Sequence, residues 1–156
     1  MIERVARTAS TNSDLLERLR HWPVDVPFAP VLRVAEVQTM GRGRHGRAWH
    51  GEAGAALTFS LAWASTRDDL GGLSLAVGVA LAEALDGGNP PRIGLKWPND
   101  LVIGDVSGLR KLGGVLIETA PLGPRRAAVI GVGINVLAPR SPALTTAASL
   151  DELDAG

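Results

Sequence analysis

Positive charge gathers among glycines in one short segment of the sequence. Residues 41–47 read Gly41-Arg42-Gly43-Arg44-His45-Gly46-Arg47. No acidic residue lies between Glu36 and Glu52. Glycine lets backbone N–H groups approach an anion closely, and the planar arginine fork binds phosphate or carboxylate through two parallel hydrogen bonds. The segment therefore predicts an anion site suited to a nucleotide phosphate.

Better-known phosphate loops do not fit this segment. Its glycine spacing matches G-x-G-x-x-G, but a dinucleotide fold requires a helix directly afterwards, and residues 48–51 (AWHG) lead into an apolar strand instead. The sequence holds neither the partner motifs of a protein kinase nor a Walker A lysine. A solvated basic hairpin tip is the plain alternative to an anion site.

Five further segments carry polar groups at the ends of apolar runs. They are Ser10-Thr11-Asn12, Gln38, Lys96-Trp97-Pro98-Asn99-Asp100, Lys111-Leu112-Gly113-Gly114 and Gly131-Val132-Gly133-Ile134-Asn135. Helix capping, a strand end, a turn, an edge lysine and close strand packing are their structural explanations. Asp100 is also a candidate for holding Mg²⁺ through water. The three histidines lack metal-type spacing, so no metal is assigned to histidine ligands.

Apolar periodicity predicts the elements that must position these groups. We expect a helix starting at Thr11, with capping-box spacing to Asp14, and ending near Trp22. Strands are expected over residues 31–37 and 56–64, followed by a helix over 73–85. Short strands follow at 93–97, 101–103, 115–117 and 127–132. Strands grouped apart from helices predict an α+β fold, a mixed or antiparallel sheet with helices packed on one face.

Composition narrows the class of protein. The 156 residues suit one domain, and the formal net charge is zero, which argues against a surface that grips nucleic acid or a membrane. There is no cysteine, so disulfides and a thiol nucleophile are excluded. The chain lacks a long apolar run and a signal peptide, so we expect a cytoplasmic protein.

Five motifs, taken in order over residues 10–135, resemble biotin–protein ligases, also named biotin–[acetyl-CoA-carboxylase] ligases: Ser10-Thr11-Asn12, Gln38 with Gly41–Arg47, Lys96–Asp100, Lys111–Glu118 (KLGGVLIE) and Gly131–Asn135. The resemblance implies a mixed sheet related to class II aminoacyl-tRNA synthetases. It implies that ATP, with Mg²⁺, activates biotin as biotinyl-5′-AMP. A lysine of a biotin carboxyl carrier domain then takes the biotinyl group. A homodimer through an exposed sheet edge is a further expectation that the resemblance allows.

The resemblance also implies roles for particular residues. Biotin is expected to contact Ser10, Thr11, Asn12, Gln38, Arg42, Gly43, Arg44 and Lys111. The nucleotide is expected to contact Arg47, Lys96, Asn99 and Asn135. The catalytic residues are expected to be Lys111, Arg44 and Arg47. In these roles Lys111 would offset the charge of the pentavalent transition state, and the loop with Arg42 and Arg44 would close over the adenylate.

Alternatives follow from where the chain departs from the family pattern. Residues 1–137 are expected to form the ligase-like catalytic domain and 138–156 a poorly structured or truncated tail with little core. Family members continue into a small C-terminal barrel domain, so one alternative is a non-catalytic module that binds biotin or biotinyl-adenylate. No helix-turn-helix precedes Met1, so a repressor role is not expected. A lipoate or octanoate ligase on the same scaffold is the other alternative.

Overall fold

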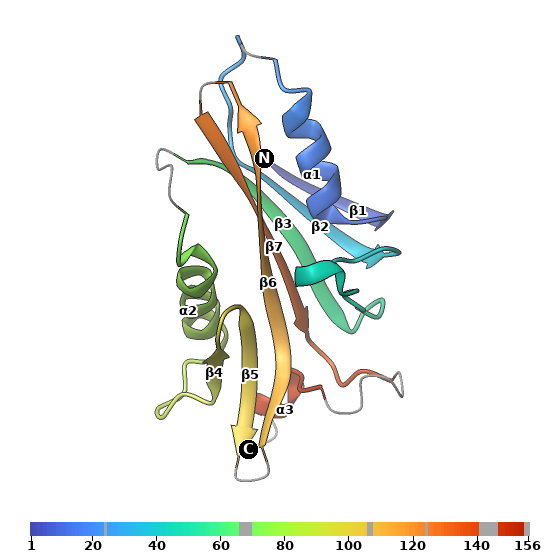
Figure 1. Ribbon diagram of the computed structural model, residues 1–156. Coiled ribbons are helices and arrows are strands. Elements are labelled where there is room, and N and C mark those ends of the chain that lie inside the picture. Colours follow the sequence, from blue (N-terminus) through green and yellow to red (C-terminus); the bar gives the residue numbers. More distant parts are fainter. Residues whose placement is uncertain (24, 66–69, 106–107, 124, 141–146, 155–156) are drawn as a thin grey trace.

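Figure 1 shows the computed structural model, which describes residues 1–23, 25–65, 70–105, 108–123, 125–140 and 147–154. The strands are β1 (Ile2–Thr8), β2 (Val31–Gln38), β3 (Ala56–Ser65), β4 (Ile93–Lys96), β5 (Asp100–Asp105), β6 (Gly108–Leu122) and β7 (Arg125–Asn135). The helices are α1 (Thr11–Arg20), α2 (Leu73–Leu85) and α3 (Asp151–Asp154), with a 3₁₀ turn η1 (Arg44–Gly46). None of the helices in these ranges is long and apolar enough to cross a membrane.

The seven strands form one mixed sheet in the order β1-β2-β3-β7-β6-β5-β4. β1 and β2 are parallel, and every other neighbouring pair is antiparallel. β7 lies at the centre of the sheet, and its residues from Ala127 to Asn135 are buried. The α+β class and the mixed sheet are as predicted.

The two long helices cover opposite faces of the sheet. Along β7, Ala127 and Val129 belong to the apolar cluster that contains Leu15, Leu16 and Leu19 of α1. The alternate residues Ala128 and Ile130 belong to the cluster that contains α2. Successive strand side chains point to opposite faces, so α1 and α2 lie on different sides (Figure 1). The prediction that the helices share one face is wrong, because β7 is apolar on both faces and needs cover on both.

Most elements fall where the sequence places them, but β1 was not predicted. Its sequence, IERVART, alternates poorly because charged residues occupy both faces. One of these charged residues, Glu3, is stabilised in the strand by ion pairs with Arg18 at 2.8 Å and Arg33 at 3.0 Å. β6 is also far longer than the predicted residues 115–117, because glycines and charged residues hide its apolar alternation.

The start of α1 differs from the predicted cap by one residue. Ser10 is the N-cap, and its hydroxyl accepts a hydrogen bond from the Ser13 amide at 3.4 Å. Asp14 does not complete a capping box, since its carboxylate accepts from Thr8 Oγ1 and Arg33 Nε, each at 2.7 Å. Thr11 is thereby free of capping and turns its side chain toward the sheet.

The segment at residues 147–154 adds to the core, which differs from the expectation of a tail with little core. Ala148 and Ser149 are fully buried. The Ala148 amide donates to the Lys111 carbonyl at 2.8 Å, so this segment runs beside β6. The rest of the expected tail, at residues 141–146 and 155–156, lies outside the described residues. The domain boundary at residue 137 stays a prediction.

Candidate functional site

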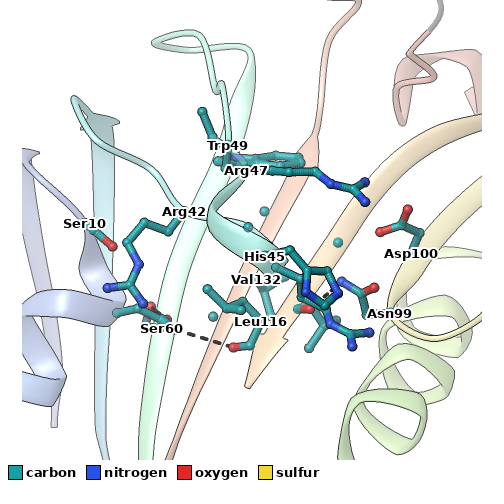
Figure 2. A pocket seen from close by; sticks show the side chains of 18 of the residues that line it. Ser10, Arg42, His45, Arg47, Trp49, Ser60, Asn99, Asp100, Leu116 and Val132 are labelled. Carbon is teal, nitrogen blue, oxygen red and sulfur yellow. Dashed lines mark hydrogen bonds between the residues drawn. The ribbon is translucent and has the colours of Figure 1, made fainter. Parts of the chain in front are cut away.

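A cavity of about 480 Å³ lies on the α1 face of the sheet, over strands β3, β7 and β6. Glycines make room for it. A Cβ atom at Gly131 would lie 2.3 Å from Asn12 Oδ1, and one at Gly133 would lie 2.3 Å from the Trp49 ring. Figure 2 shows Ser60 and Arg42 on one side of the cavity, with Trp49 above. The two glycines of β7 therefore let an asparagine and an indole approach the strand backbone.

The cavity gathers eleven of the twelve residues that the sequence analysis assigned to a site. They are Ser10, Thr11, Asn12, Gln38, Arg42, Gly43, Arg44, Arg47, Lys96, Asn99 and Lys111. Asn135 is the exception. Its side chain is buried and donates to the Ala148 carbonyl at 3.0 Å, so it ties the segment at residues 147–154 to β7. Its contact with the nucleotide stays a prediction.

The floor of the cavity is an uncharged hydrogen-bond network, which we call the polar floor: Thr11, Asn12, Gln38 and Ser60. Gln38 Oε1 accepts from the Thr11 amide at 2.7 Å and from Thr11 Oγ1 at 3.0 Å. Thr11 Oγ1 lies 2.7 Å from Ser60 Oγ, which donates to Asn12 Oδ1 at 2.5 Å. Thr11, Asn12 and Ser60 are each at most 3% exposed. The network is therefore rigid and shielded from water.

Cations line the cavity from the loop that follows β2. Gly43 and Arg47 close it through a 2.7 Å hydrogen bond from the Gly43 amide to the Arg47 carbonyl, and His45 adopts the left-handed region with φ 56°. Arg42 forms an ion pair with Glu118 of β6. Neither Arg44 nor Arg47 forms an ion pair with an acidic residue in the described part of the chain. Their guanidinium groups are therefore available to an anion.

Lys111 reaches the cavity from a bulge in β6. Val102 of β5 pairs with Lys111, but Leu101 pairs with Gly113, so Leu112 is the extra residue of the bulge. Bulges re-aim side chains beside functional sites. Here Lys111 Nζ lies 2.7 Å from Asp100 Oδ1, with the lysine side chain 46% exposed. We call Lys111, Asp100, Arg44 and Arg47 the ionic end of the cavity. Figure 2 shows Arg47 and Asp100 at this end.

Three residues of this region were not assigned roles from the sequence. Ser60 is the buried centre of the polar floor, and only its polarity within the apolar run of β3 hints at a site. Trp49 covers Gly133, and its indole N–H is buried without a hydrogen-bond partner among the described residues. Glu118 stands behind Asn12 and contacts Arg42. Ser60 lies in no motif of the sequence analysis, and the contacts of Ser60 and Glu118 with Asn12 are long-range, so local patterns do not predict these contacts.

A mixed sheet whose polar floor faces a cationic loop defines a binding domain for a small molecule with an anionic end. A family model described as the biotin/lipoate A/B protein ligase family matches residues 5–135. The bifunctional ligase/repressor BirA of Escherichia coli is 41% identical over 130 residues, which cover 81% of this chain and 38% of that protein. The chain belongs to the biotin/lipoate A/B protein ligase family, as the sequence resemblance predicted.

Two further relatives give the same result. The biotin–[acetyl-CoA-carboxylase] ligase of Mycobacterium tuberculosis is 38% identical over 148 residues, covering 86% of this chain and 49% of that protein. The biotin protein ligase of Aquifex aeolicus, solved with biotin and ATP, superposes with a TM-score of 0.74 at 31% identity, over 99% of this chain and 61% of that one. The chain thus spans less than half of the length of the two curated relatives.

Proposed function

We propose that this chain is the catalytic unit of a biotin protein ligase. It joins biotin to ATP, releasing pyrophosphate, and then transfers the biotinyl group from biotinyl-5′-AMP to a lysine of a biotin carboxyl carrier domain. Support comes from the names of the curated relatives and from the biotin and ATP held by the Aquifex aeolicus ligase. The observation that carries the proposal is the union of the polar floor and the ionic end in one cavity.

The polar floor matches one end of biotin. The ureido ring offers two N–H donors and one carbonyl acceptor, and the floor offers hydroxyl and amide groups shielded from water. A buried polar group without a partner costs about 1–3 kcal/mol, so the floor favours a ligand that can pair with it. The volume of about 480 Å³ also suits a molecule of this size.

The ionic end matches the other end of biotin, where the first reaction occurs. A carboxylate oxygen of biotin attacks the α-phosphorus of ATP, and the bond from that phosphorus to the pyrophosphate oxygen breaks. Negative charge builds on the phosphoryl oxygens in the transition state. Lys111, Arg44 and Arg47 supply positive charge at this end, and fixed charges in a partly dry site are usually the largest contribution to catalysis.

The second reaction needs no covalent enzyme intermediate. The ε-amine of the carrier lysine attacks the acyl carbon of the adenylate, the C–O bond breaks, and AMP leaves with the electron pair. Lys96 and Asn99, from the turn between β4 and β5, line the nucleotide side of the cavity in this proposal. The absence of cysteine is consistent with direct transfer.

Mg²⁺ is part of the proposal as the ion that accompanies ATP. It commonly binds through one or two carboxylates together with substrate phosphates and water. Asp100, on the cavity wall beside Lys111, is a carboxylate of this kind. When bound, the ion would neutralise charge on the phosphates.

Activity separates this proposal from its two alternatives. A mixture of the protein, ATP, Mg²⁺, labelled biotin and a carrier domain is scored for labelled adenylate and labelled carrier. We expect both products, and none when lipoate or octanoate replaces biotin, because their apolar ends leave the polar floor unpaired. Tight biotin binding without adenylate would show a binding module instead. Activity with lipoate or octanoate alone would show the other ligase type.

A further inference from the structure

Glu118 lies outside the cavity lining, yet both of its carboxylate oxygens hold groups that line it. Oε2 accepts from Asn12 Nδ2 at 2.9 Å, and Oε1 accepts from the Arg42 guanidinium. The side chain is 24% exposed, so the carboxylate is partly shielded. It therefore touches the polar floor on one side and the cationic loop on the other.

The contact with Glu118 decides which way the Asn12 amide points. A side-chain amide has a donor end and an acceptor end, and the choice between them follows from its neighbours. The Nδ2 end faces the Glu118 carboxylate and, at 3.5 Å, the Leu116 carbonyl, which are both acceptors. Oδ1 must then face Ser60 and Gly131, which line the cavity. Asn12 is thus held as an acceptor toward the cavity.

A similar contact orients the amide of Gln38. The Thr11 amide N–H can only donate, so Gln38 presents its oxygen to it. The polar floor therefore has two amide oxygens joined by the hydroxyls of Thr11 and Ser60. Three close O···O contacts link Gln38 to Thr11, Thr11 to Ser60, and Ser60 to Asn12. Only the hydroxyls of Thr11 and Ser60 supply protons to them, so one of the three contacts has no proton. The floor has spare acceptor capacity, which favours a ligand that brings N–H donors.

We propose that Glu118 is a positioning residue for substrate selection: it fixes Asn12 as an acceptor and, through Arg42, ties the cationic loop to the same carboxylate. The inference rests on the proposed function, since the donors that it selects are the ureido N–H groups of biotin. Glu118 acts through Asn12 and contacts neither biotin nor the reacting atoms.

Exchanging the donor and acceptor between positions 12 and 118 tests this role. In Asn12→Asp, two carboxylates face each other across a hydrogen-bond distance, and we expect the Kd for biotin to rise about 100-fold. In Glu118→Gln, the amide of Asn12 can turn over, and a rise of about tenfold is expected. In the double variant, the amide introduced at position 118 donates to the carboxylate introduced at position 12, which again offers an oxygen to the cavity. The double variant should bind biotin within about tenfold of the wild type.

A structural role alone would not produce this pattern of ligand selection. Calorimetry is repeated with the two cyclic carbamate analogues of biotin, each with one ring N–H replaced by oxygen. Wild type and double variant should both disfavour the analogue that lacks the N–H facing Asn12, and Glu118→Gln should lose most of that preference. The melting temperature of each variant is measured alongside. Glu83→Gln, an exposed carboxylate of α2, is the control for the loss of charge and should bind like the wild type.

The outcomes distinguish this inference from the proposed function. Wild-type protein that binds no biotin would overturn both. Wild-type protein that binds biotin, with a double variant no better than Asn12→Asp, would overturn the positioning role alone. Unchanged analogue preference in Glu118→Gln would do the same. Recovery of both affinity and preference in the double variant would support it.

Discussion

The polar floor and the ionic end share one cavity but differ in how firmly the fold holds them. Thr11, Asn12 and Ser60 are almost fully buried and belong to α1 and β3. By contrast, the Lys111 side chain of the ionic end is 46% exposed, and Arg47 is exposed. Rigid elements thus carry the groups that recognise uncharged atoms, while a loop and a bulge carry the charges. Under the proposed function, we expect biotin to be selected at the floor and the reaction to occur at the ionic end.

The strongest test of this division removes the lysine of the ionic end. In Lys111→Ala, we expect kcat for adenylate formation to fall by about 100- to 1000-fold, the effect of losing one charge-stabilising group in a transition state. The Kd for biotin should change far less, because the polar floor is intact. Single-turnover kinetics with labelled biotin measure the first quantity, and calorimetry measures the second.

Lys111→Arg is the matched variant for this test. It keeps the positive charge beside Asp100 and should retain more activity than the alanine variant. An unchanged kcat in Lys111→Ala would remove the lysine from the chemistry. If Lys111→Ala weakens only the binding of biotin, the lysine recognises the substrate, and the proposed division of roles between the polar floor and the ionic end is wrong.

The complementary test removes one hydroxyl from the polar floor. Thr11→Val keeps the shape and the backbone bond to Gln38 but loses the contacts of Oγ1 with Gln38 and Ser60. We expect the Kd for biotin to rise about tenfold, and kcat at saturating biotin to stay within about threefold. Thr58→Val is the control, because this buried β3 hydroxyl bonds the Ala35 carbonyl outside the cavity. If Thr11→Val and Thr58→Val raise the Kd for biotin equally, the effect comes from altered packing and not from the polar floor.

The same two regions also differ in how far the sequence predicts them. Thr11, Asn12 and Gln38 were assigned because they stand in short local segments that resemble a family. Ser60 completes the floor and Glu118 holds Asn12 from outside it, but they lie 48 and 106 residues from Asn12 in the chain, so no local spacing predicts these contacts. Asn135 was assigned to the nucleotide from a segment that resembles the family. Its side chain donates to the Ala148 carbonyl, and the nucleotide role stays a prediction.

The same contrast between local and long-range signals separates the secondary-structure elements that were predicted from the one that was missed. Helix α2 was predicted at its observed bounds, because leucine or valine occupies every fourth position from Leu73 to Leu85 and helix-favouring alanines fill many of the others. β1 was missed because ion pairs, which depend on α1 and β2, replace the apolar alternation of an ordinary strand. The placement of the two helices on opposite faces depends on β7 being apolar on both sides. Periodicity alone does not distinguish a continuous apolar run of this length from a buried helix, so the sequence does not settle that pattern.

Hydrogen exchange should show the difference in rigidity directly. Without ligand, the backbone amides of residues 41–47 should exchange far faster than those of β7, because glycines and like-charged arginines disfavour one closed conformation. With biotin and ATP present, exchange in residues 41–47 should slow by about tenfold or more, while β7 changes little. A loop that is equally protected in the empty protein would show that the ionic end is as rigid as the floor.

The smallest expected effect concerns Asp86, which anchors β4 and so supports Lys96, a residue that lines the cavity near the ionic end. Backbone amides of Ile93 and Arg92 donate to its carboxylate and hold its pKa below the ordinary value of about 3.9. A lowered folded-state pKa stabilises the fold above the unfolded value, and that contribution disappears as the pH falls through the folded value. Asp86→Asn should therefore melt below the wild type at pH 7, and the gap should close below about pH 4. The affinity of Asp86→Asn for biotin at pH 7 should be unchanged, because the polar floor is built on α1, β2 and β3 and not on β4. A loss of affinity in this variant would show that the two ends of the cavity are coupled.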